Sequence, residues 1–263
     1  MVGNTGDRDQ KRFTLKLISD PSYAVQLAVA KHCAFKDNPL NKTMYPMDDE
    51  NVSLPWLAER ERRAIMEGKS TITVIIDNDD SGADGEKIAA YARWKIPAKF
   101  RPENPDYKQR DDEDKQEGGI SVGAGSTAAL TVAEELDGRK YIEPPLPAGS
   151  NVPLVTEFRA ALNMLRKTYW NEETEYLLGS LSTDPSYQGQ GCGSLLLDWG
   201  VRHADANGAA IYLESTPVAQ KLYKKFGWKA VDRMELDLGK YGGPNLMHGL
   251  TAMRREARST SSS

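Results

Sequence analysis

The chain has 263 residues, a formal net charge of −4 and two cysteines. This length fits one domain with an elaboration, the charge argues against nucleic acid as a partner, and two cysteines are too few for a disulfide framework. The polar N-terminus does not resemble a signal peptide, and no apolar run approaches the roughly 18 residues of a membrane span. We therefore expect a protein of the cytosol or nucleus that binds no membrane; its oligomeric state has no signal in the sequence.

The N-terminal third alternates between strand and helix patterns. Asp20 and Pro21 are typical of a helix start, and Gly68 is typical of a helix end. Polar turn residues separate the last two segments, which are rich in strand-forming residues. The predicted elements are a strand at 12–18, a helix at 21–35, a loop at 38–49, a helix at 54–67 and strands at 71–76 and 88–96.

Residues 97–152 interrupt this order. Residues 101–116 are mostly charged, residues 118–126 are rich in Gly and Ser, and residues 144–147 form a proline-rich linker. This composition buries too little apolar surface to offset chain entropy. We expect an insertion of low order, acting as a lid or a partner-binding segment.

The C-terminal half returns to regular patterns. Helices are predicted at 154–169 and 219–226, strands at 176–183 and 210–214, and a closing hairpin at 228–238 and 246–253, followed by a disordered tail at 256–263. A further amphipathic helix begins near Ser194, because Leu195, Leu196, Trp199 and His203 fall on one stripe.

A glycine loop, residues 188–194, connects the predicted strand at 176–183 to that helix. Its three alternate glycines allow a ligand to approach the backbone closely. The amides of the loop and of the helix N-terminus suit an anion such as a pyrophosphate. The loop therefore predicts a cofactor that carries phosphate.

A dinucleotide site is one alternative for this loop. Glu214 lies about where a ribose-binding acid would stand, but Gly193 is one place early and Ser194 takes the fingerprint position. About 180 residues also precede the loop, whereas a dinucleotide fold usually begins with this unit. A P-loop is excluded because no Gly-Lys-Ser/Thr closes the loop.

The segment resembles the GNAT acyltransferase superfamily. Gln188, Gly191 and Gly193 match its Q/R-x-x-G-x-G/A loop, and 219–228 matches its A-x-x-L-Y-x-x-x-G-F/W helix end. The resemblance covers 176–237 and is greatest to fungal GNAT-domain proteins and puromycin N-acetyltransferases. It implies a single α+β domain over 10–255, with a mixed, mostly antiparallel central sheet flanked by helices and splayed at 176–183.

The resemblance also implies an N-acetyltransferase. Such an enzyme transfers an acetyl group from acetyl-CoA to a primary amine by direct attack in a ternary complex, and we expect a small-molecule acceptor. A lysine of a protein or peptide, and a non-catalytic acyl-CoA-binding module, remain alternatives. The residues implied to bind the cofactor are Leu181, Ser182, Thr183, Gln188, Gly189, Gln190, Gly191, Cys192, Gly193 and Ser194.

Two residues are candidates for proton transfer. Tyr223 matches the tyrosine of the helix-end motif, and a neutral phenol can donate to a departing thiolate. Glu214 ends a predicted strand, where apolar surroundings would raise its pKa toward that of a useful base. Asp184 is a rival base, but beside Pro185 it suits ordering the turn.

The remaining reactive residues suggest no second chemistry. Cys192 is interpreted as a small residue that fills the loop rather than a nucleophile, and three scattered histidines lack metal-ligand spacing, so no metal is expected. We expect the acceptor pocket between the first two helices and the strand at 88–96. Its aromatic candidates are Tyr45, Trp56, Tyr91 and Trp94.

Overall fold

The computed structural model describes residues 12–82, 85–102 and 143–258. These residues form a mixed seven-stranded sheet in the order β1-β2-β3-β4-β5-β7-β6, in which only β4 and β5 are parallel neighbours. This is the α+β architecture that the sequence predicts. The strands are β1 (Phe13–Ile18), β2 (Ser70–Gly82), β3 (Gly85–Lys95), β4 (Tyr176–Thr183), β5 (Ile211–Ser215), β6 (Lys229–Asp237) and β7 (Met247–Arg255).

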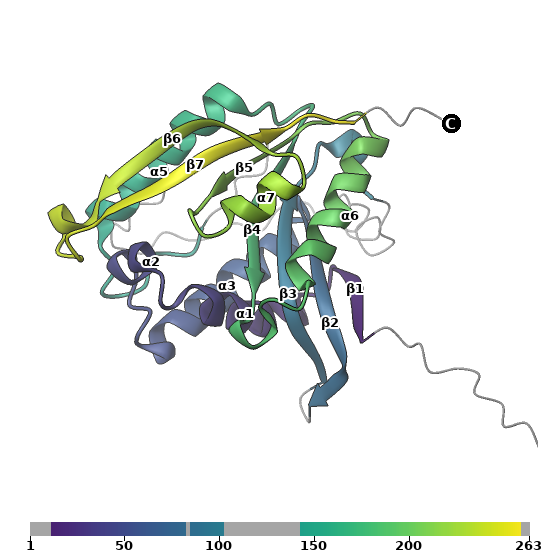
Figure 1. The fold of residues 1–263 in the computed structure, drawn as a ribbon. Coiled ribbons are helices and arrows are strands. Elements are labelled where there is room, and N and C mark those ends of the chain that lie inside the picture. Colours follow the sequence, from purple (N-terminus) through teal and green to yellow (C-terminus); the bar gives the residue numbers. More distant parts are fainter. Residues whose placement is uncertain (1–11, 83–84, 103–142, 259–263) are drawn as a thin grey trace, which may run out of the picture.

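Six α-helices are described, and they cover both faces of the sheet (Figure 1). Their starts follow local chemistry: the Asn38 side chain caps α2, and Asn151 caps α5 with a proline in the first turn. The helices are α1 (Ala24–Phe35), α2 (Pro39–Met44), α3 (Glu50–Glu67), α5 (Val152–Tyr169), α6 (Cys192–Ala206) and α7 (Gln220–Lys225).

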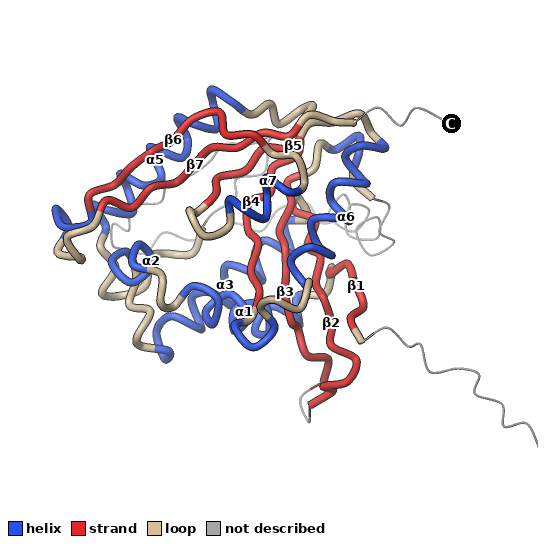
Figure 2. The backbone as a smooth tube through the Cα atoms, viewed as in Figure 1, coloured by secondary structure: helices blue, strands red, loops and turns tan. Residues whose placement is uncertain are grey.

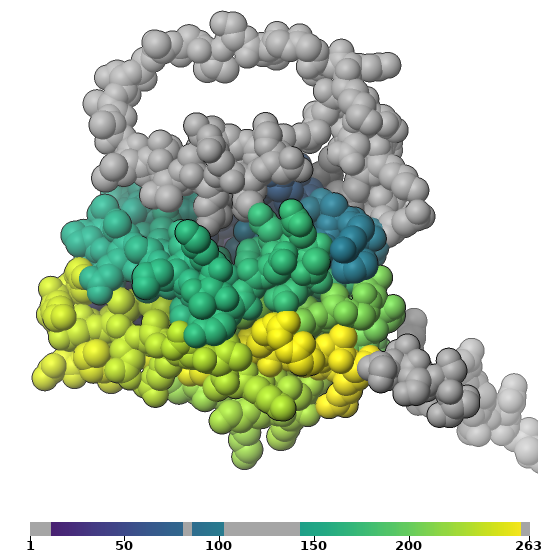
Figure 3. Space-filling view, turned by 90° about the horizontal axis from the view of Figure 1, so that it is seen from above, coloured from purple at the N-terminus to yellow at the C-terminus, as the bar shows by residue number. Residues whose placement is uncertain are grey.

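The two faces have separate cores. Leu196 and Leu197 of α6 pack with Trp94 on one face, while Leu27 of α1 and Ile65 of α3 pack on the other. Gly200 of α6 lies so close to the Trp94 indole that an added Cβ would be 2.3 Å from it. Along β6 and β7, the covering helix is α5, which lies beside the C-terminal hairpin in Figure 3.

The observed elements follow the predicted order, with local differences. The predicted loop at 38–49 contains α2, because Asn38 accepts hydrogen bonds from the next two free amides and so starts a helix. The predicted turn at 77–85 is instead the end of a long hairpin between β2 and β3. Asp20 caps its helix as expected, although the first turn, Pro21–Tyr23, is 3₁₀.

Some expectations concern residues that are not described. Most of the predicted insertion, 103–142, and the end of the predicted tail, 259–263, lie outside the described residues. Within the described part of the chain, no helix has both the length and the apolar character to cross a membrane.

Candidate active site

The sheet opens between β4 and β5. The two strands pair only from Tyr176 to Leu178, against Ile211 to Leu213. At Gly179 a bulge shifts the register with β3, so that Leu178 faces Trp94 while Ser180 faces Arg93. A bulge bends its strand, and Figure 2 shows β4 and β5 running apart here. The edge of Leu181, Ser182 and Thr183 that faces away from β3 therefore has no strand partner among the described residues.

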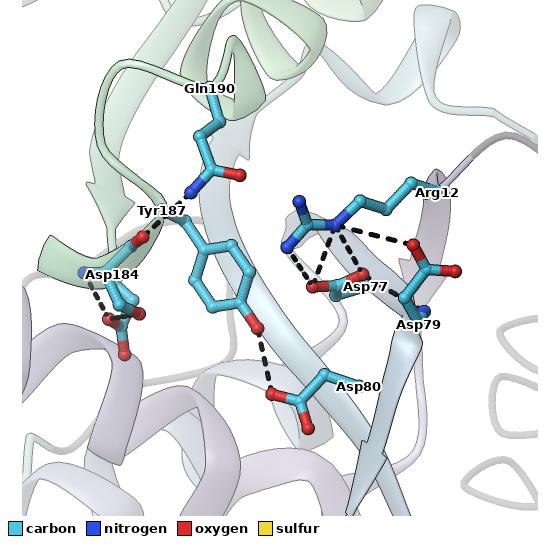
Figure 4. A network of polar contacts seen from close by, with 8 residues as sticks. Arg12, Asp77, Asp79, Asp80, Asp184, Tyr187 and Gln190 are labelled. Atoms are coloured by element: carbon cyan, nitrogen blue, oxygen red, sulfur yellow. Dashed lines mark hydrogen bonds and ion pairs between the residues drawn. The ribbon is translucent and has the colours of Figure 1, made fainter.

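The loop after β4 is fixed by its own side chains (Figure 4). Asp184 accepts hydrogen bonds from the Ser186 amide at 2.9 Å and from its hydroxyl at 2.6 Å. Gln190 donates to the Ser186 carbonyl at 2.8 Å, and the Tyr187 hydroxyl donates to Asp80 at 3.2 Å. The prediction that Asp184 orders the turn is confirmed, and the Gln190 side chain is likewise engaged within the loop.

The glycines of the loop serve different purposes. Gly189 and Gly191 have φ values of +77° and +89° and open space on the side where a Cβ would stand. Gly193 has no such backbone; its missing Cβ would lie 3.4 Å from the Thr183 hydroxyl, so it lets α6 approach β4. The first hydrogen bond of α6 runs from the Leu195 amide to the Gly191 carbonyl, 3.0 Å away. The amides of residues 192–194 thus have no helical acceptor.

Tyr223 lies in α7 on the α6 face of the sheet. It is 6% exposed, its ring packs edge-on against Trp228 at 5.8 Å, and none of the described residues hydrogen-bonds to its hydroxyl. Burial raises the pKa of the Tyr223 phenol above its usual range. The hydroxyl is therefore protonated at neutral pH and retains a hydrogen to donate.

Glu214 lies in β5 and points to the opposite face, toward α5, because it alternates with Leu213 of the α6-side core. Its side chain is 7% exposed. Two hydrogen bonds from Arg166 of α5 reach its carboxylate, from Nε at 2.8 Å and from Nη2 at 3.0 Å. The surroundings are thus not the apolar ones expected from the strand pattern. A guanidinium that contacts both oxygens fixes the orientation of the carboxylate.

A cavity of about 1020 Å³ opens on this second face. Gly179, Ser180 and Glu214 line it at the point where β4 and β5 part, and α1, α2, α3, α5 and β3 supply the other walls. Tyr45 is the one predicted aromatic residue that lines it. The Trp56 ring packs against the Tyr45 ring, with 4.6 Å between the ring centroids. Tyr91 and Trp94 are buried in the cores on the two faces of the sheet.

The cavity also contains residues that sequence reasoning missed. They include several cations, among them Lys31, Arg93 and Arg166. They lie in α1, β3 and α5, in segments far apart along the chain. No spacing within any one segment distinguishes them from solvated surface charges.

The other reactive residues are structural. Cys192 is 1% exposed, and burial raises the pKa of its thiol, which opposes a nucleophilic role. His203 accepts or donates a hydrogen bond at 2.9 Å to the Tyr176 hydroxyl, and burial lowers its pKa. The described residues contain no group of three His, Cys, Asp or Glu arranged to hold a metal ion.

Comparison with known proteins agrees with this geometry. Residues 160–230 match the family model of the acetyltransferase (GNAT) domain. No curated protein matches the chain significantly in sequence. Among solved structures, arylalkylamine N-acetyltransferase 2 from Aedes aegypti superposes with a TM-score of 0.54 at 15% identity, covering 94% of this chain and 100% of that one. An agmatine N-acetyltransferase mutant gives 0.51 at 14% identity, again with 94% and 100% coverage.

Proposed function

We propose that this chain, a member of the GNAT acetyltransferase superfamily, transfers an acetyl group from acetyl-CoA to the primary amine of a small molecule. One observation carries the proposal: the parting of β4 and β5 joins the α6 N-terminus, where the amides of residues 192–194 have no helical acceptor, to a cavity on the other face. A thioester held in this gap would present its carbonyl to an amine in the cavity.

The donor would be held mainly by backbone groups. We place the pyrophosphate against the amides of 188–194, where Gly189 and Gly191 leave room for its oxygens. The pantetheine arm would take the place of a strand beside β4, with amide and carbonyl groups of Leu181, Ser182 and Thr183 as its partners. Neither contact needs a cationic side chain, which accords with an acidic protein.

The proton transfers would use one residue from each face. The neutral amine attacks the thioester carbonyl carbon, the C–S bond breaks, and the thiolate receives a proton from Tyr223, which recovers one from solvent. Glu214, directly or through a water, accepts the proton that the amine loses. Arg166 would act as a positioning residue by holding the Glu214 carboxylate.

The size of the cavity favours a small acceptor. Its volume of about 1020 Å³ lies at the upper end of typical ligand pockets, and its walls enclose a ligand on several sides. The two structural neighbours are named for small amines, arylalkylamines and agmatine. We infer an acceptor of this size for this chain.

Calorimetry with acetyl-CoA, CoA and NADPH tests the donor. We expect micromolar binding of acetyl-CoA and CoA and none of NADPH. Binding of NADPH in place of acetyl-CoA would contradict the proposal and favour a dinucleotide enzyme.

Thiol release with a panel of small amines and lysine peptides then tests transfer. Turnover of small amines supports the proposal. Acetyl-CoA binding without turnover of any amine would indicate a non-catalytic acyl-CoA-binding module, and turnover of peptides alone would indicate a protein acetyltransferase.

A further inference from the structure

Two carboxylates at the acceptor cavity, Glu143 in its wall and Glu61 behind the wall, each lie within ion-pair distance of two cations that line the cavity. Glu61 of α3 is fully buried. Its Oε1 lies 3.1 Å from Lys31 Nζ, and its Oε2 lies 3.8 Å from Arg93 Nη1. Glu143 contacts both Arg60, at 3.0 Å, and Arg159. These four cations come from α1, α3, β3 and α5 and all line the cavity. We call this set, Lys31, Arg60, Arg93 and Arg159, the basic wall.

The basic wall leaves an excess of positive charge. Around Glu61, the two cations Lys31 and Arg93 face one carboxylate, a local charge of about +1 among the described residues when Lys31 is protonated. Burial lowers the pKa of Lys31 to about 8; Glu61 opposes this shift, and the nearby charges of Arg60 and Arg93 contribute to it. An anion in the cavity would relieve this repulsion.

Arg93 has the most unused binding capacity. Its side chain is only 19% exposed, and its ion pair with Glu61, the one formed within the described part of the chain, is too long for a hydrogen bond. None of the described residues accepts a hydrogen bond from its guanidinium. A guanidinium has five N–H donors in a planar fork that matches a carboxylate. The Arg93 nitrogens are not enclosed by the described residues, and Arg93 lines the cavity, so these donors are available to a ligand there.

Arg93 also stands close to the proposed point of reaction. In the β3–β4 register it lies opposite Ser180, the residue after the bulge where β4 leaves β5. Residues opposite one another in an antiparallel pair point to the same face, with their Cα atoms roughly 5 Å apart. Both residues line the cavity together with Glu214. A compact acceptor in the cavity can therefore have one end at the thioester and the other at Arg93.

We infer that the acceptor is an amine that also carries a carboxylate, and that Arg93, with Lys31 beside it, binds that carboxylate. This inference rests on the proposed function and specifies its substrate class. An acceptor with only positive charge would place its second cation against the basic wall, where like charges repel. In this respect the cavity suits amino acids better than arylalkylamines or agmatine, which carry no acid group.

An amino acid and its decarboxylated amine differ only in the carboxylate, so comparing the two measures the contribution of the carboxylate to binding. Arginine and agmatine, tyrosine and tyramine, and lysine and cadaverine would be compared for equilibrium binding to the free protein and to the protein with CoA added, and for thiol release. We expect each acid to bind roughly tenfold or more tightly than its partner, the size of a charge-assisted contact. Equal or tighter binding of the decarboxylated amines would overturn the inference. Methyl esters of the acids control for the lower pKa of the amine beside a carboxylate.

Variants of Arg93 test whether this residue causes the preference for the carboxylate-bearing acceptor. Arg93→Gln should remove most of the preference for the acids and leave agmatine binding within about twofold, whereas Arg93→Lys should keep part of it. Arg202→Gln, at an exposed position on α6, is the matched control and should change neither. Equal losses for acid and amine in Arg93→Gln, with an unchanged melting temperature, would contradict a carboxylate contact.

The two proposals fail in different ways. Absence of acetyl-CoA binding and of turnover would end the proposed function, while the binding comparison of acid and amine would still decide the nature of the cavity. Turnover confined to decarboxylated amines would keep the proposed function and reject only the carboxylate-bearing acceptor.

Discussion

The two faces of the sheet are built by different means. The face covered by α6 and α7 has an apolar core, and its proposed ligand contacts are backbone amides and an unpaired strand edge. The face covered by α1, α3 and α5 encloses a cavity whose walls are charged side chains from separate elements. A backbone site suits a ligand that never changes, such as CoA, whereas side-chain charges can be replaced one at a time. The first face therefore suits the common donor and the second the particular acceptor.

The largest expected effect is a loss of stability from a variant on the face covered by α1, α3 and α5, which we call the charged face. Glu61→Gln removes the counter-charge of Lys31 and Arg93 in a buried place and should cost about 3 kcal/mol of unfolding free energy, measured by urea denaturation. Glu59→Gln on the same helix is the control, because its partially exposed pairs with Arg62 and Arg63 are worth less than about 1 kcal/mol. Equal losses in the two variants would show that the Glu61 cluster contributes no more than a surface pair.

The pH dependence of the Glu61 contribution has a definite sign. Burial alone would raise its pKa, but Lys31, Arg93 and Arg60 lower it to about 2, against about 4.3 in an unfolded chain. The stabilisation is therefore present above about pH 4.3 and lost as the pH falls toward 2. Glu61→Gln should flatten this part of the stability profile.

The next effect concerns the apolar face. Tyr223→Phe should lower kcat about 100-fold, or about 2.7 kcal/mol, with little change in the Kd of acetyl-CoA, because the ring remains and only the proton donor is lost. Tyr176→Phe, at a tyrosine whose hydroxyl is bonded to His203 and Asn207, is the matched control for loss of a buried hydroxyl and should spare turnover. Unchanged turnover in Tyr223→Phe would refute the role of general acid.

The buried Lys31 on the charged face should also make the stability of the protein depend on pH. Its pKa is about 8 in the folded protein against 10.5 ordinarily. Between these values the unfolded chain binds more protons, so the stability of the wild type should rise with pH, by an amount of the order of 3 kcal/mol. Lys31→Met should lose this rise, and Lys240→Met, at an exposed position, should keep it. A rise of equal size in Lys31→Met would mean that other groups cause it.

The smallest expected effect comes from two glycine variants, which distinguish a cost in backbone conformation from a loss of ligand contact. Gly191→Ala and Gly208→Ala each place a side chain at positive φ with open space around it, so each should cost about 1 kcal/mol of stability. Only Gly191 lies in the proposed pyrophosphate loop, and only its variant should weaken acetyl-CoA binding, by about fivefold. Similar binding in both variants would place the pyrophosphate elsewhere.

On the face covered by α6 and α7, much of the strand, loop and helix structure could be predicted from the sequence. Strand, loop and helix are consecutive around 176–206, so the loop conformation depends on nearby residues such as Asp184 and Gly191. Backbone conformation of this kind is fixed by steric and hydrogen-bonding preferences within a few residues. The same locality explains why the cap by Asp20 was predicted and why α2 was missed, since Asn38-Pro39 is a start signal for a helix too short to show periodicity.

The charged face was decided by the tertiary structure. Arg166 and Glu214 meet although 48 residues separate them, and Lys31 and Glu61 meet across 30. The expected apolar surroundings of Glu214 were wrong because a strand pattern describes one strand, not the helix that packs against it. Likewise the bulge at Gly179 opens the sheet only because β3 and β5 lie on its two sides. Local chemistry determined the elements and the glycine loop of this protein, and long-range packing decided which charges surround the proposed acceptor cavity.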